Sequence, residues 1–197
     1  MIIVDLELTG LDPEKHAIID IAAIEFENPR NRFDCQCNLR DGAEIDDVSL
    51  GFNEYTKESI SLSNISLEEA MISFLKWNST ISNRTISGMS NDTDILFLKK
   101  SFSLYNLPWD FGHRKIDIHS ISYAIAIKNG FEISTNEYNT SNFNSDAIME
   151  FVGIPKEKKP HIALNGVLCE TEALSRLIYG KNLLPEFSKY TVPDYLL

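Results

Sequence analysis

The sequence predicts a single α/β domain, and three features of its pattern support that fold class. The first part of the chain holds three segments that run or alternate in apolar residues, at 1–7, 17–27 and 32–39. Turn-rich stretches separate these segments, which is typical of neighbouring β-strands. Amphipathic segments then alternate with short apolar ones, which indicates helices between further strands. With 197 residues, the chain is long enough to bury one sizeable core.

The later elements are predicted from helix caps and apolar positions. Ser66 and Glu69 form a capping box, so we expect a helix over 66–81. Residues 40–65 are polar and irregular, with a short helix expected over 54–60. Further strands are expected at 85–88 and 114–118, and further helices at 92–105, after a cap at Asp117, at 145–152 and at 162–179. In the helix at 92–105, Leu96, Phe97 and Leu104 are expected to point inward. A flexible loop is expected at 132–144, a charged loop at 155–160, and a tail at 181–197 that packs on the 1–180 domain.

Charge and composition narrow the class of protein. The net charge of −11 argues against a protein that wraps a nucleic-acid duplex, because extended phosphate contact needs many Lys and Arg residues. It leaves open an enzyme that holds only the last few nucleotides. No apolar run approaches the roughly 20 residues of a membrane span. A signal segment is not expected, because Asp5 and Glu7 interrupt the first apolar run. The three cysteines are expected to be reduced structural thiols, which favours a cytoplasmic location.

Asp5 and Glu7 are the first candidate functional residues. They follow an apolar strand, and residues two apart in a strand point to the same face. Neighbouring carboxylates raise each other's pKa unless a cation lies between them, and a hard divalent ion prefers oxygen ligands. The alternative interpretation is two solvated acids near an N-terminus, because this spacing of acids is common.

Three segments of the chain resemble the motifs of the DEDD-type (histidine variant) 3′–5′ exonucleases. Residues 5–13 (DLELTGLDP) resemble the first motif, and 18–26 resemble the family's second strand. Asp94 follows Gly88 by six residues and has Phe and Leu three and four positions later, as in the second motif. The third motif aligns with 161–166 (HIALNG). Within the family, the resemblance is strongest to oligoribonuclease and to the proofreading subunit of bacterial DNA polymerase III.

The resemblance implies a ribonuclease H-like fold, with a central mixed five-stranded sheet flanked by helices. It also implies a two-metal site for Mg²⁺ or Mn²⁺, in which Asp5 bridges both ions, Glu7 holds one and Asp94 the other. His161 is then the general base, and its alternative is a surface histidine in a charged loop. Substrate contacts are expected from the two residues after the acidic pair, Leu8 and Thr9.

Gly166 departs from the family pattern, which has a metal-binding Asp at this position. Three explanations remain open: a binding protein that has lost catalysis, an engineered knock-out, or replacement by a neighbouring carboxylate. Glu170 is one helical turn further on, in the arc of apolar residues, and is the candidate replacement. Glu172 falls on the opposite face of that helix and is expected to be exposed to solvent.

Together these features predict a metal-dependent 3′–5′ exonuclease. Its expected partners are the 3′ ends of single-stranded DNA or RNA, its expected products are nucleoside 5′-monophosphates, and it has no expected membrane partner. A homodimer is compatible with the sequence. The alternative is a catalytically impaired nucleic-acid-binding or interaction module on the same fold.

Overall fold

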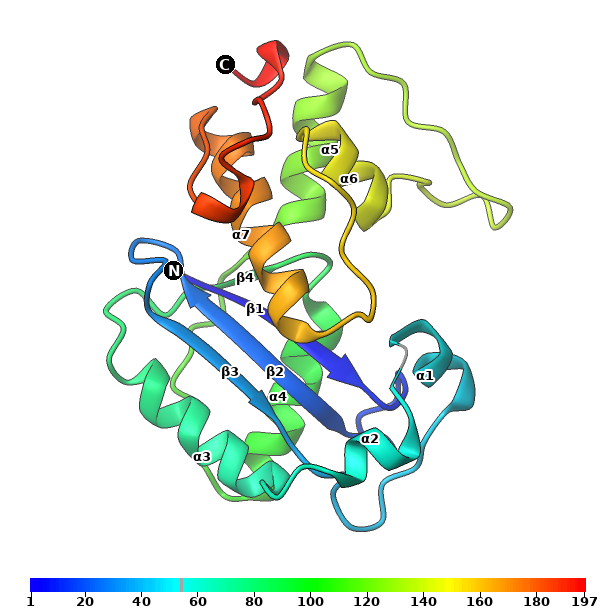
Figure 1. Cartoon of the computed structure of the whole chain (residues 1–197), viewed down its shortest axis with the longest axis vertical. Helices are drawn as coiled ribbons and strands as arrows, with labels where there is room; N and C mark the ends of the chain where they lie inside the picture. The colour runs from blue at the N-terminus through cyan, green and yellow to red at the C-terminus, as the bar shows by residue number, and fades with distance from the viewer. Residues whose placement is uncertain (54) are drawn as a thin grey trace.

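The computed structural model describes residues 1–53 and 55–197, which form a mixed five-stranded sheet flanked by helices (Figure 1). The strand order is β3 (Arg32–Gln36), β2 (Ile18–Glu25), β1 (Ile2–Leu8), β4 (Ile86–Gly88) and β5 (Lys115–Asp117). The first three strands in the sequence pair antiparallel, whereas β1, β4 and β5 are parallel. The prediction of a mixed five-stranded sheet is therefore confirmed.

The helices agree with most of the sequence prediction. Within the described residues they are α1 (Asp47–Asn53), α2 (Lys57–Ser61), α3 (Leu67–Asn78), α4 (Asp92–Leu104), α5 (Ile118–Lys128), α6 (Ser145–Phe151) and α7 (Ala163–Tyr179), followed by 3₁₀ turns at Pro185–Phe187 and Asp194–Leu196. Ser66 and Glu69 form the expected capping box, and Asp117 caps α5 by accepting from the Ser120 amide. None of these helices is both long and apolar enough to cross a membrane.

The region 40–65 differs from its prediction. The helix expected over 54–60 is α2, which begins at Lys57, and position 54 lies outside the described residues. Helix α1 was not predicted, because its sequence has no apolar period. Asp46 supports its first turn by accepting from the amide of Val48 at 2.9 Å.

The alternation along β1 assigns its residues to two cores. Ile2, Val4, Leu6 and Leu8 pack in the core that includes buried side chains of α3 and α4. Ile3 packs in the other core, which includes side chains of α5, α6 and α7. Because side chains alternate along a strand, Asp5 and Glu7 share the face of Ile3, and α7 lies over that face (Figure 1).

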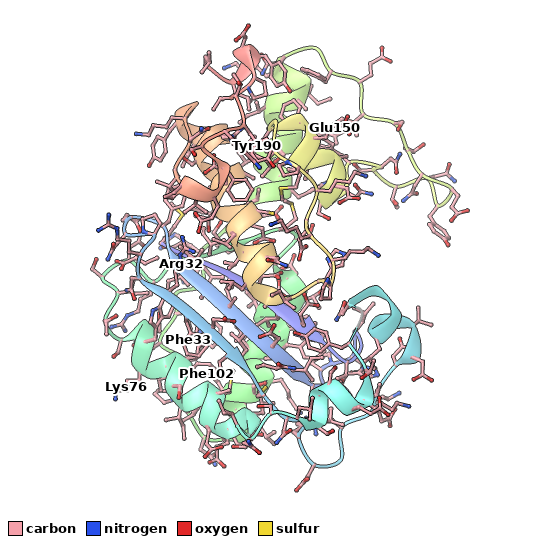
Figure 2. The ribbon with its side chains drawn as sticks, viewed as in Figure 1. Arg32, Phe33, Lys76, Phe102, Glu150 and Tyr190 are labelled. Carbon is pink, nitrogen blue, oxygen red and sulfur yellow. The ribbon has the colours of Figure 1, made fainter. Side chains whose placement is uncertain are left out.

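An aromatic cluster fills the opposite face of the sheet. Phe33 of β3 contacts Phe74 of α3, and Phe102 of α4 packs edge-on against the same ring. Figure 2 labels Phe33 and Phe102. Helix α4 contributes Phe97 to this core, as predicted, but Leu96 and Leu104 are 55% and 45% exposed. The prediction that these two side chains point inward was wrong, because the buried residues of α4 are Phe97, Leu98, Ser101 and Phe102.

Residues 181–197 pack against α7 and cover the helix face that was predicted to be exposed to solvent. Leu184 and Phe187 are buried there. Glu172 is fully buried rather than exposed: it accepts from the Arg176 guanidinium at 2.8 Å and from two amides of the tail. The prediction for Glu172 was wrong because a wheel drawn for one helix does not show what a distant segment covers.

Candidate active site

Asp5 lies between small residues that leave room for its carboxylate. Its register partner on β2 is Ala22, and Gly166 of α7 faces it from above. A Cβ atom added at position 166 would lie 2.3 Å from Oδ2 of Asp5, far inside van der Waals contact. The carboxylate therefore occupies the space that a side chain at 166 would need. Both residues line a cavity of about 370 Å³ together with Met89, Ser90, Asn144, Ser145, Asp146, Met149, Glu157, Cys169 and Glu170.

Glu170 brings a second buried carboxylate to this cavity. It is 6% exposed, and its Oε1 accepts from the Met89 amide at 3.1 Å, at the end of β4. Its Oε2 is buried without a hydrogen-bond partner. Desolvation, and next the negative charge of Asp94, raise the pKa of Glu170 well above its ordinary value. A buried carboxylate oxygen with no donor is costly unless something else binds it.

Glu7 and Asp94 complete the acidic cluster. Glu7 is 7% exposed, and its pKa is raised to about 9 by desolvation and then by the charges of Glu157, Asp20 and Asp94. Asp94 lies in the first turn of α4, and desolvation raises its pKa to about 7. Asp5 experiences the same effects: desolvation first and then the charges of Glu170, Asp94 and Glu7 raise its pKa well above the ordinary value. The structure thus places Asp5 within electrostatic reach of the other three predicted acids.

His161 lies beside this cluster, just before α7. Its Nδ1 atom is 3.0 Å from Oε2 of Glu157, four residues earlier in the loop. The sequence prediction did not include Glu157, although an acid four residues before the predicted base was a visible signal. The charge of Glu157 contributes to raising the pKa of Asp5 and of Glu7. This carboxylate therefore links His161 electrostatically to the predicted metal-binding residues.

Asp20 is another site residue that sequence reasoning missed. It is paired in register with Glu7 and is 4% exposed. Its Oδ2 accepts from the Ala163 amide at 3.1 Å and from the Tyr55 hydroxyl at 2.8 Å. Asp20 thereby fixes the first turn of α7, and with it the His161 segment, to strand β2. The sequence feature that could have indicated Asp20 is its position as a single acidic residue among the apolar residues before the end of β2.

Leu8 and Thr9, the two predicted substrate contacts, differ in their access to the surface. Leu8 lines a pocket of about 280 Å³ beside Glu7, whose wall also includes the exposed side chains of Leu11 and Val48. Thr9 is fully buried: its hydroxyl donates to the Glu44 carbonyl at 2.8 Å and accepts from the Ala17 amide at 3.0 Å. The hydroxyl of Thr9 is thus engaged within the protein, behind the pocket, whereas Leu8 forms part of its surface.

The acidic cluster has the chemistry of a site for hard divalent cations. Within residues 1–53 and 55–197, no three His, Cys, Asp or Glu side chains are already arranged as a metal-binding group. The donors that face one another are nevertheless all carboxylate oxygens, which such cations prefer. The unpartnered Oε2 of Glu170, and the cavity that it lines together with Asp5, are consistent with a cation between these side chains.

The mixed five-stranded sheet flanked by helices has the ribonuclease H-like fold. The family model described as an exonuclease, RNase_T, matches residues 2–165. The chain belongs to this exonuclease family, and the predicted membership of the DEDD-type 3′–5′ exonucleases is confirmed. No curated protein matches the chain.

Solved structures share the fold at low sequence identity. The nuclease domain of 3′hExo, a DEDDh family member bound to rAMP, has a TM-score of 0.68 at 15% identity, covering 92% of each chain. Cell-death related nuclease 4 has a TM-score of 0.72 at 17% identity, covering 97% of this chain and 65% of its own. The zinc-bound E. coli exonuclease I–ssDNA complex has a TM-score of 0.69 at 16% identity, covering 91% of this chain and 40% of its own. This chain therefore spans about two fifths of exonuclease I.

Proposed function

We propose that this protein is a metal-dependent 3′–5′ exonuclease that hydrolyses the terminal phosphodiester bond of single-stranded nucleic acid and releases nucleoside 5′-monophosphates. The observation that carries the proposal is the convergence of Asp5, Glu7, Asp94 and Glu170 beside His161. Burial raises the pKa of all four carboxyls, and Asp5 is raised further by the charges of the other three. Buried acids of this kind are costly for a stable fold and are typical of functional sites.

Asp5, Glu7, Asp94 and Glu170 are the proposed ligands of Mg²⁺ or Mn²⁺. Two such ions, when bound, lower the pKa of water and stabilise the charge that develops on the phosphate and on the leaving oxygen. In this assignment Glu170 supplies the carboxylate that the family has at the position of Gly166. Its support is the buried Oε2 atom, which has no other partner.

His161 is the proposed general base. Its side chain is 33% exposed, so its ring is accessible to water at the edge of the cluster. With Nδ1 held by Glu157, the Nε2 atom is the one that can accept a proton from the attacking water.

The pocket beside Glu7 is the proposed site for the terminal nucleoside. Leu8, Leu11 and Val48 offer an apolar surface against which a base can pack. An apolar surface does not distinguish one base from another, which suits an enzyme that removes successive nucleotides. The net charge of −11 agrees with contact to a short end rather than to a long duplex. Single-stranded DNA is also the ligand named for the exonuclease I complex.

Oligonucleotides of DNA and RNA, labelled at either end, test the proposal. With Mg²⁺ or Mn²⁺, we expect 5′-labelled strands to shorten in steps and 3′-labelled strands to release a labelled mononucleotide at once, with both reactions stopped by EDTA. Asp5→Asn should remove nearly all activity and most Mn²⁺ affinity in calorimetry, because the cations lose a shared negative ligand. Binding of the strands without any metal-dependent cleavage would instead identify a non-catalytic binding module.

A further inference from the structure

The loop before α7 places a carboxylate directly behind the imidazole of His161. Oε2 of Glu157 lies 3.0 Å from Nδ1 of His161, a normal hydrogen-bond distance. The two residues are separated by Lys158, Lys159 and Pro160, outside any helix, so the contact is not a by-product of helical spacing. Asp20 holds the start of α7 by accepting from the Ala163 amide, which fixes the segment that carries the imidazole.

The environment of Glu157 differs from that of a surface ion pair. Its side chain is 20% exposed, and it lines the same cavity as Asp5 and Glu170. Its second oxygen, Oε1, is buried without a hydrogen-bond partner. By comparison, the pair Lys156–Asp146 nearby is 64% and 47% exposed. Exposed pairs of that kind contribute little to stability, whereas a half-buried pair at a site orders the groups it joins.

The contact has a specific chemical consequence. An ionised carboxylate is only an acceptor, so a hydrogen bond to Nδ1 requires the proton of neutral imidazole to be on that nitrogen. The lone pair is then on Nε2, which makes this atom the proton acceptor. We propose that Glu157 is a positioning residue that holds His161 in the tautomer with Nε2 unprotonated and fixes the plane of the ring. The inference rests on the proposed function, in which His161 is the general base.

Kinetic measurements on two variants test this role. Glu157→Ala removes the acceptor, and Glu157→Gln keeps the shape of the side chain but offers an amide that can donate to Nδ1 and favour the wrong tautomer. Each should lower kcat by roughly 10–100-fold, the usual cost of losing such an orienting partner, with KM and Mn²⁺ affinity changed by less than about tenfold. If Glu157 only supports the fold of the loop, the isosteric Gln variant should restore full activity.

A double-mutant cycle adds a second kinetic test. His161→Ala should itself lower kcat by roughly 10²–10⁴-fold, the usual range for general acid–base catalysis. In that background Glu157→Ala should cause no further loss, because it acts only through the histidine. The matched control is Glu150→Ala, which removes an exposed glutamate from α6 (Figure 2) and should leave kcat unchanged.

Nitrogen-15 NMR of the imidazole rings tests the pairing without any activity. In the metal-free wild-type protein at neutral pH, His161 should show the Nδ1-protonated tautomer, and both Glu157 variants should shift it toward the Nε2-protonated form. The chain has four histidines, so His161→Gln assigns the signal by its disappearance.

The outcomes separate this inference from the proposed function. Full activity or an unchanged tautomer in the Glu157 variants overturns the positioning role while leaving the exonuclease in place. A loss of Mn²⁺ affinity of tenfold or more in Glu157→Gln also overturns it, because Glu157 is then a metal ligand. If the wild-type protein cleaves nothing, the proposed function fails, and the NMR spectra still decide whether Glu157 sets the tautomer of His161.

Discussion

At the scale of single residues, Gly166 is the position where this chain departs most clearly from its family. The structure gives a steric reason for glycine there, because a Cβ atom would lie 2.8 Å from Cγ of Asp5 and closer still to its oxygen. The atoms in the way belong to the end of the Asp5 side chain, so a side chain at 166 would have to turn this carboxylate away from its present position. Glycine at 166 therefore lets the Asp5 carboxylate keep the position that it has in this structure.

The first prediction concerns Glu170 as the replacement ligand. Glu170→Gln should suppress cleavage as severely as Glu7→Gln and weaken Mn²⁺ binding by about 10–100-fold or more, because both lose a charged oxygen ligand. Calorimetry with Mn²⁺ and single-turnover cleavage would measure both effects. Nearly unchanged metal binding in Glu170→Gln would mean that Glu170 is not a ligand.

Substitutions of Gly166 provide the complementary test. Gly166→Asp should lower activity, because its Cβ displaces the carboxylate of Asp5 and a further negative charge enters a crowded cluster. Gly166→Ala is the matched control, since it adds the same Cβ without the charge, and it should lose activity as well. A sharp rise of nuclease activity in Gly166→Asp would show instead that the natural chain lacks one ligand.

At the scale of elements, α7 joins the acidic cluster to the end of the chain. Its first half carries Gly166 and Glu170, and its second half carries Arg176, which is fully buried. The Arg176 guanidinium donates to Glu172 and to carbonyls that include Val152, Gly153 and Tyr190. The residues at 181–197 are thereby held against the same helix that covers Asp5.

The second prediction concerns this buried ion pair. Arg176→Ala should reduce the free energy of unfolding by about 3–5 kcal/mol, because it leaves Glu172 buried without its partner. Urea unfolding followed by circular dichroism would measure the change. The matched control is Arg32→Ala, which breaks the partly exposed pair with Glu186 and should cost no more than about 1 kcal/mol. Equal losses in the two variants would contradict the role of Arg176 as an anchor for the tail.

At the scale of the whole molecule, the acidic cluster makes stability depend on pH and on divalent cations. A carboxyl whose pKa is higher in the folded than in the unfolded chain binds its proton more tightly when folded. That stabilisation is complete below the unfolded pKa, near 4.5 for Glu7 and 3.8 for Asp94. It is lost as the pH rises through the folded values, about 9 for Glu7 and about 7 for Asp94.

The third prediction follows from this linkage. The Tm of the EDTA-treated protein should fall as the pH rises from 5 to 9, and Mg²⁺ or Mn²⁺ at pH 8 should restore much of the loss by binding the ionised cluster. Glu7→Gln should raise the Tm of the metal-free protein at pH 8 by several degrees, at about 2–4 °C per kcal/mol for a chain of this size, while activity is lost. Glu150→Gln, an exposed glutamate, is the control and should change neither. A metal-free Tm that rises across this interval would contradict the linkage.

Local patterns in the sequence were sufficient for the features that depend on neighbouring residues. The period of two along β1 placed Asp5 and Glu7 on one face, and the capping signals at Ser66 and Asp117 located two helices. The order of the motifs gave the family and the mixed sheet. These features are set by backbone geometry over a few residues, so they can be read without knowing the rest of the chain.

Only the tertiary structure decided which residues meet across the fold. In the folded chain Glu157 contacts His161, and Gly166 lies against Asp5. Glu172 is buried by the tail at 181–197, which a helical wheel of α7 alone does not show. The structure also showed that Thr9 turns its hydroxyl inward while Leu8 faces a pocket. The physical reason is that burial and carboxylate pKa values depend on contacts between segments far apart in the chain. The amino-acid sequence by itself therefore determined the family and its acids, and the packing of α7 over the sheet determined how those acids form a site.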